Sequence, residues 1–171
     1  MLLRPDEYLT GVTRIDLDRL ASAGVKGLII DLDNTLLPRD TNEMPPALRT
    51  WTDMLHTRGI GVCLVSNNWH ERVHKVAADL GFPLVAKAIK PLPFAFWRAL
   101  RVLGLKSREC AVVGDQIFTD VLGGNLIGSK TILVRPLSTA DLPHTLVLRR
   151  LESLIMQGRE PSPTTGGSTL S

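Results

Sequence analysis

Short runs of branched aliphatic residues alternate along the chain with longer segments whose apolar residues recur at helical spacing. The aliphatic runs predict strands at residues 25–30, 60–65, 83–88, 111–113 and 131–134, and the segments around them predict helices at residues 16–23, 45–58, 69–80, 93–103 and 119–126. Strands without polar positions are typical of a parallel sheet covered on both faces. Strands alternating with helices also predict right-handed crossovers. We therefore expect an α/β fold with a three-layer, doubly wound, Rossmann-like parallel sheet.

The C-terminal part of the chain predicts one more helix and then a disordered tail. Residues 143–157 place Leu148, Leu151, Leu154 and Ile155 on one side and two arginines opposite. Such a helix either covers the sheet or lies on a membrane surface. Residues 158–171 are rich in Ser, Thr, Gly and Pro, which predicts disorder. We expect a single domain over residues 1–157, because 171 residues with 44% hydrophobic content suit one core.

Composition and charge favour a cytoplasmic protein without a nucleic-acid partner. The net charge is +3, and the basic residues are spread along the chain rather than clustered. Cys63 and Cys110 lie in apolar segments, where free thiols are expected, as in a reducing compartment. The N-terminus lacks the long apolar region of a signal peptide, and no segment approaches the roughly 20 apolar residues of a membrane span.

Polar side chains follow four successive strands at the point where each strand ends. In chain order these are Asp31 with Asp33, Ser66 with Asn67, Lys90, and Asp115 with Asp120 a turn later. The carboxyl ends of parallel strands meet at one edge of a sheet, where open α/β folds bind ligands. On a regular strand Asp31 and Asp33 would share a face. We therefore expect these residues to converge on one site.

Several carboxylates at one sheet edge require a cation. Two like charges about 4 Å apart repel by roughly 4 kcal/mol at an effective dielectric constant of 20. Oxygen ligands with no His or Cys among the strand ends favour Mg²⁺. Such a site can transfer phosphoryl groups, with one carboxylate as nucleophile, a second as acid and base, and Mg²⁺ with Lys90 neutralising phosphate oxygens. Ser66 and the amides around Asn67 would bind a further phosphate oxygen.

These segments resemble the four motifs of the haloacid dehalogenase (HAD) superfamily. The motifs are Asp31-Leu32-Asp33-Asn34-Thr35, Ser66-Asn67-Asn68, Lys90-Pro91, and Gly114-Asp115-Gln116 through Thr119-Asp120. With Gly123-Gly124-Asn125 they resemble more narrowly the YqeG-like class IIIA phosphatases, over about residues 5–155. That branch is similar to mitochondrial and plastid phosphatidylglycerophosphate phosphatases, in which Arg often stands where this chain has Gln116.

The resemblance implies a Mg²⁺-dependent phosphomonoesterase that forms an aspartyl phosphate. It implies Asp31 as nucleophile, Asp33 as acid and base, and a metal held by Asp31, the Asp33 carbonyl and Asp115. It makes Asp120 a supporting or water-mediated metal ligand, for which the alternative is a role as the N-terminal cap of the helix that follows. Dehalogenases of the superfamily lack the second acid, so Asp33 favours a phosphatase.

The intervals between the motifs leave no room for a cap domain. A capless, open site suits a bulky phosphorylated substrate such as a lipid headgroup or a macromolecule, or a site closed by another subunit of an oligomer. A small soluble phosphate is the alternative substrate. A receiver-like phospho-binding module uses similar residues, but such modules place paired acids on the first strand and the phosphorylated Asp on the third. A catalytically weak scaffold is a third alternative.

Two further groups of residues have a structural interpretation beside a functional one. His70 and His74 have the spacing of a paired metal site, but without a third ligand an exposed helix face is expected. Phe94, Phe96 and Trp97 could form an aromatic platform, but packing against the sheet is expected.

Overall fold

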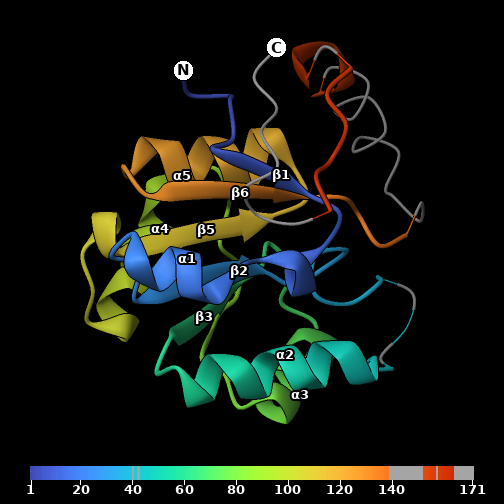
Figure 1. Ribbon diagram of the computed structural model, residues 1–171. Coiled ribbons are helices and arrows are strands. Elements are labelled where there is room, and N and C mark those ends of the chain that lie inside the picture. The colour runs from blue at the N-terminus through green and yellow to red at the C-terminus, as the bar shows by residue number, and fades with distance from the viewer. Residues whose placement is uncertain (40, 42, 139–151, 157, 164–171) are drawn as a thin grey trace.

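A six-stranded parallel sheet forms the centre of the computed structural model (Figure 1). The structure describes residues 1–39, 41, 43–138, 152–156 and 158–163. The strands are β1 (Glu7–Leu9), β2 (Gly27–Asp31), β3 (Gly61–Val65), β4 (Leu84–Val85), β5 (Cys110–Gly114) and β6 (Lys130–Val134). They lie in the order β1-β6-β5-β2-β3-β4, and every neighbouring pair is parallel. The predicted parallel sheet is therefore confirmed.

The edge strand β1 was not predicted from the sequence. It has only three residues, Glu7-Tyr8-Leu9, of which Leu9 alone is buried, so no aliphatic run marks it. It lies beside β6, with Glu7 opposite Ile132 and Leu9 opposite Val134 (Figure 1). On the other side of β1, Ser162 accepts a hydrogen bond from the Thr10 N–H and donates its own N–H to the Tyr8 carbonyl.

Helices cover both faces of the sheet. They are α1 (Leu17–Ser22), α2 (Pro46–Thr57), α3 (Glu71–Leu80), α4 (Pro93–Leu103) and α5 (Leu122–Leu126). Apolar residues of α1, α2 and α3 share one buried cluster with Leu28 and Ile30 of β2, whereas α4 shares a second cluster with Ile29. Because neighbouring strand residues point to opposite faces, the two clusters lie on opposite sides of the sheet. The three-layer arrangement is confirmed.

The segment predicted as one helix at residues 119–126 divides into two parts. A π-helical turn covers Ile117–Val121, and α5 covers only Leu122–Leu126. Glycines let α5 pack closely: a Cβ atom at Gly123 would lie 2.2 Å from the Phe96 ring, and one at Gly124 would lie 2.6 Å from Thr131 Cγ2. The Gly-Gly pair that weakens the helical pattern is thus required by packing against α4 and the sheet.

The described residues that follow β2 and β3 form no inserted domain. Between β2 and α2, the described residues 32–39, 41 and 43–45 form turns and loop, and the β3–β4 interval contains α3 alone as a helix or strand. Within these residues the structure is capless, as predicted.

Of the predicted C-terminal helix at 143–157, residues 152–156 are helical, whereas residues 143–151 and 157 lie outside the described residues. Residues 164–171 of the predicted tail lie outside them as well. No described helix is both long enough and apolar enough to cross a membrane.

The cysteines and histidines agree with the structural interpretation, and the aromatic residues agree only in part. Cys63 and Cys110 are buried free thiols. His70 and His74 are exposed on α3 and at its N-terminus. Phe96 is buried, but Phe94 and Trp97 are exposed, so the expectation of packing is wrong for those two.

Candidate active site

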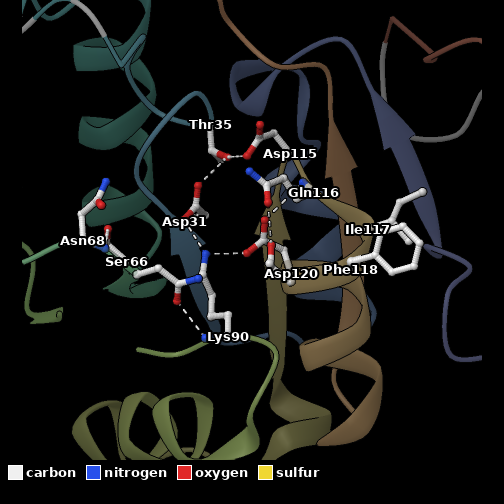
Figure 2. A network of polar contacts seen from close by, with 12 residues as sticks. Asp31, Thr35, Ser66, Asn68, Lys90, Asp115, Gln116, Ile117, Phe118 and Asp120 are labelled. Carbon is white, nitrogen blue, oxygen red and sulfur yellow. Dashed lines mark hydrogen bonds and ion pairs between the residues drawn. The ribbon is translucent and has the colours of Figure 1, made fainter. Parts of the chain in front are cut away.

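The sheet register brings the predicted residues to one edge. Asp31 is the last residue of β2, which lies between β3 and β5. It pairs with Val65, so Ser66 follows one residue beyond, and Ile30 pairs with Val113, so Asp115 lies just beyond the same level on β5. Lys90 reaches this edge from the loop between β4 and α4 (Figure 2). Residues separated by about 85 positions in the sequence therefore meet because their strands are neighbours.

Lys90 joins two of the carboxylates. Its ammonium group donates hydrogen bonds to Asp31 Oδ1 and, at 2.6 Å, to Asp120 Oδ1 (Figure 2). All three side chains are buried. Burial alone would lower the pKa of the Lys90 ammonium, but Asp120 and Asp31 together raise it above its usual range. The two carboxylates therefore favour the charged form of the lysine.

Thr35 joins a different pair of carboxylates. Its hydroxyl oxygen lies 3.2 Å from Asp31 Oδ2 and 3.2 Å from Asp115 Oδ1 (Figure 2). A hydroxyl group has one proton, so it can donate to one ionised carboxylate at a time. The structure thus places Thr35 between the ends of β2 and β5.

The acidic cluster of Asp31, Asp115 and Asp120 fits a divalent cation. One carboxylate oxygen from each residue lies within 4.8 Å of the others. Lys90 contacts only two of these three carboxyl groups, Asp31 and Asp120. Burial raises the pKa of the Asp31 carboxyl to about 7, although Lys90 opposes the shift. Burial likewise raises the pKa of Asp120. A bound cation would relieve this accumulation of negative charge, and the all-oxygen donor set suits Mg²⁺.

The side chain of Asp33 does not join this cluster. The strand ends at Asp31, and Asn34 adopts a left-handed conformation with φ of 61°, which Asn tolerates better than most residues. The Asp33 carboxylate accepts hydrogen bonds from Asn68 Nδ2 and Arg72 Nη1, both at 2.5 Å. The metal role predicted for Asp33 concerns its main-chain carbonyl, and it stays a prediction.

Arg72 connects Asp33 with the loop that follows β2. While Nη1 binds Asp33, Nη2 donates to the carbonyl oxygens of Pro38 at 2.7 Å and Thr41 at 3.0 Å. The guanidinium group therefore fixes the carboxylate and the loop at once. Sequence reasoning missed both Arg72 and Asn68 as neighbours of Asp33. Asn68 lies within the second motif, whereas nothing in the sequence pairs Arg72 with a residue 39 positions earlier.

The second motif lines the opposite side of the site. Ser66 is buried, and its hydroxyl oxygen accepts the Asn68 N–H at 3.0 Å. The side-chain oxygen of Asn67 accepts the main-chain N–H of Lys90 at 2.7 Å. The side-chain carbonyl of Asn67 thus holds the loop that carries Lys90. The predicted contact of Asn67 with phosphate stays a prediction.

The π-helical turn after β5 fixes Asp120. The Oδ2 atom of Asp120 accepts the Gln116 N–H at 3.2 Å. Asp120 lies inside the π-helical turn, and Val121 is the N-terminal cap of α5, so the alternative role of Asp120 as that cap is wrong. A Cβ atom on Gly114 would lie 2.2 Å from the Asp120 carboxyl, so glycine is needed there. Glu152, which the sequence did not single out, accepts the N–H groups of Ile117 at 2.7 Å and Phe118 at 3.4 Å.

Comparisons with known proteins agree with this geometry. The HAD-hydrolase-like family matches residues 88–142, which contain Lys90, Asp115 and Asp120. The probable phosphatase YqeG of Bacillus subtilis is 43% identical over 152 residues, covering 89% of this chain and 88% of that protein. The chloroplastic and mitochondrial phosphatidylglycerophosphate phosphatase 1 of Arabidopsis thaliana is 29% identical, covering 84% of this chain but 44% of its own length.

A solved structure supports the fold independently. A HAD-superfamily hydrolase of subfamily IA from Geobacter sulfurreducens superposes with a TM-score of 0.53 at 18% identity, covering 64% of this chain and 89% of that one. The relationship to YqeG extends over nearly all of both sequences, and the four motifs of the superfamily meet at one sheet edge. The chain therefore belongs to the YqeG-like phosphatases of the haloacid dehalogenase superfamily.

Proposed function

We propose that the protein hydrolyses phosphomonoesters through an aspartyl-phosphate intermediate on Asp31. The observation that carries this proposal is the position of Asp31, whose carboxylate contacts both Lys90 and Thr35 at the edge of the acidic cluster. A buried carboxylate that is shielded from water and held by fixed hydrogen-bond donors is suited to act as a nucleophile. No other described carboxyl group joins the lysine, the threonine and the cluster in this way.

The proposed reaction has two displacements at phosphorus. In the first, a carboxylate oxygen of Asp31 bonds to phosphorus, the ester P–O bond breaks, and Asp33 gives its proton to the departing alkoxide. In the second, Asp33 takes a proton from a water molecule, the water oxygen bonds to phosphorus, and the bond to Asp31 breaks to release inorganic phosphate. Lys90 and the Ser66 hydroxyl would stabilise the phosphoryl oxygens during both displacements.

We propose Mg²⁺ as the cofactor, held by Asp31, Asp115 and Asp120 with the Asp33 carbonyl. When bound, Mg²⁺ supplies positive charge that neutralises phosphoryl oxygens. The proposal is supported by the three carboxylates, each of which offers an oxygen within 4.8 Å of the others.

For the substrate we propose a phosphorylated lipid headgroup, with phosphatidylglycerophosphate as the first candidate. The name of the Arabidopsis relative supports this choice, as does the capless edge between β2 and α2 in the described residues. A comparison of phosphatidylglycerophosphate in mixed micelles with a panel of soluble phosphates tests it. A preference for a soluble sugar phosphate would contradict the lipid assignment while leaving the phosphatase assignment intact.

Magnesium should stabilise the folded protein and support turnover. At a concentration 100 times the dissociation constant, a ligand adds about 2.7 kcal/mol, which corresponds to a rise of roughly 5–10 °C in Tm for a chain of this size. We expect this rise in a thermal-shift assay, together with release of phosphate from an aryl phosphate that EDTA abolishes. The variant Asp115→Asn should lose most of the rise, whereas Asp79→Asn, at an exposed position on α3, should retain it.

Arg72 should act as a positioning residue for Asp33. Lys in its place keeps the positive charge but has a single donor nitrogen, which does not reproduce the contacts that two separate nitrogens of Arg72 make with Asp33, Pro38 and Thr41. We expect Arg72→Lys to lower kcat by about 10- to 100-fold with little change in KM, since the contact acts on proton transfer rather than on binding. Steady-state kinetics checks this, with the exposed Arg101→Lys on α4 as control. A change confined to KM would contradict the role.

A further inference from the structure

An apolar surface lies beside the candidate active site. It consists of five large side chains that are between 47% and 68% exposed, here called the apolar rim: Trp69, Ile89, Leu92, Phe94 and Trp97. Exposed apolar residues scattered singly are ordinary, but a cluster of them marks an interaction surface. Sequence reasoning assigned two of these residues to the core, so their exposure is a finding of the structure.

Trp69 and Ile89 of the rim lie on two loops that supply the site, whereas Leu92, Phe94 and Trp97 lie at the start of α4 and in its first turns. Trp69 directly follows Asn68, which binds Asp33, and Ile89 directly precedes Lys90. One contact joins two members of the rim, since Phe94 packs edge-to-face on Trp97 with ring centres 5.6 Å apart, and a second joins the rim to a cation, since the Lys87 ammonium lies 5.2 Å from the centre of the Trp69 ring. Anything that binds the rim is therefore brought next to Lys90.

The segment that carries four of the five rim residues has basic side chains but no acidic ones, whereas Glu71 lies two residues after Trp69. Residues 80–108 contain no Asp or Glu, and they include three exposed cations in or near α4, which are Lys87, Arg98 and Arg101. A cavity of about 190 Å³ lies between Lys87 and Arg98 and is lined by Ile89, Leu92 and Phe94. A surface that has negatively charged groups above a hydrocarbon layer is complementary to this arrangement, because the apolar side chains can enter the hydrocarbon while the cations contact the negative groups.

We propose that the apolar rim binds the surface of an anionic lipid bilayer, and that Lys90 then faces the headgroup layer. This inference rests on the proposed function, because it names how a lipid phosphate would reach the site. Trp and Phe side chains partition into the bilayer interface, and basic residues beside them are attracted to anionic headgroups. The distribution of charge also disfavours a second copy of the chain, since a symmetric contact would place Lys87 and Arg98 near their own equivalents.

Sedimentation of the full chain with vesicles tests the proposal. The probes are vesicles of phosphatidylcholine alone and of equal parts phosphatidylcholine and phosphatidylglycerol. We expect binding to the mixed vesicles, at least a 10-fold weaker binding to the neutral ones, and at least a 10-fold loss in the double variant Phe94→Ala with Trp97→Ala. The control variant Met54→Ala with Leu126→Ala removes exposed apolar side chains elsewhere and should bind as the wild type does.

Activity on a soluble aryl phosphate separates the two proposals. The rim variant should keep wild-type turnover of that substrate, because neither ring belongs to the catalytic machinery, and should lose turnover only of substrate embedded in vesicles. Wild-type binding to vesicles without any phosphate release would contradict the proposed function alone. Absence of wild-type binding, equal binding by the rim variant, or a rim-dependent dimer without vesicle binding would each overturn the membrane proposal.

Discussion

Replacing Asp31 with Asn should reduce phosphate release from an aryl phosphate on the order of 10⁴-fold or more. The amide has the size of the carboxyl group but is not a nucleophile toward phosphorus, so the first displacement is lost rather than slowed. Steady-state release of inorganic phosphate with saturating Mg²⁺ measures the effect, and Asp79→Asn serves as the matched control on an exposed surface. Turnover near the wild-type rate would exclude Asp31 as the nucleophile.

The same variant should fold at least as well as the wild type without metal. Burial raises the pKa of the Asp31 carboxyl to about 7, so the folded protein holds this proton up to neutral pH, whereas the unfolded chain releases it near its usual value of 3.8. The free energy of unfolding therefore falls as pH rises from 3.8 towards about 7, and the full loss is reached above that pH. Asn has no charge to bury, so the advantage of Asp31→Asn in urea unfolding should be larger at pH 8 than at pH 5.

Replacing Lys90 with Met should affect both activity and stability. Met preserves most of the volume of the side chain but leaves Asp31 and Asp120 without the ammonium that binds them. Removing one partner of a buried charge pair costs about 3–5 kcal/mol. We expect a decrease of this size in the free energy of unfolding at pH 8 without metal, and a loss of about 10³-fold in turnover with Mg²⁺.

The stability defect of Lys90→Met should depend on pH. The pKa values of Asp31 and Asp120 are already raised by burial, and loss of the cation raises them further. At pH 5 the two carboxyl groups can take up protons, so the missing ammonium matters less and the defect should shrink. Urea titrations at pH 5 and pH 8 measure this difference, and Lys75→Met on α3 is the exposed control. A defect that is equal at both pH values would indicate lost packing rather than lost charge.

The sequence predicts the strands that are largely buried and misses β1, of which only one residue is buried. β2, β3 and β5 are continuous aliphatic runs because helices cover both of their faces. β1 has three residues at the sheet edge, and its hydrogen bonds come from β6 rather than from any local pattern. The π-helical turn is likewise invisible in the sequence, because it depends on Gly114 leaving space for Asp120.

The candidate site was predictable where strand ends define it. The positions of Asp31, Ser66 and Asp115 follow from parallel order, since each strand delivers its carboxyl end to one edge. Lys90 is different, because β4 covers only Leu84–Val85 rather than the predicted residues 83–88, and the lysine reaches the edge from the loop that follows. The departure from a regular strand at Asn34 was not predictable, and it separates the Asp33 carboxylate from that of Asp31. Contacts such as that of Arg72 with Asp33 depend on how α3 packs against the sheet, and the sequence motifs do not predict that packing.

The pairing of β1 with β6 constrains the order in which the chain can fold. Glu7 pairs with Ile132, which lies 125 positions later in the sequence, so β1 can join the sheet only after β6 has been synthesised. During synthesis from the N-terminus, the first strand therefore emerges long before the last one, while β2 and β3 can already pair. Closing such a long loop is slow, so the edge formed by β6 is completed after the centre of the sheet. We therefore expect β2 and β3, which carry Asp31 and lead to Ser66, to pair early, and β1 to be among the last segments to join the sheet.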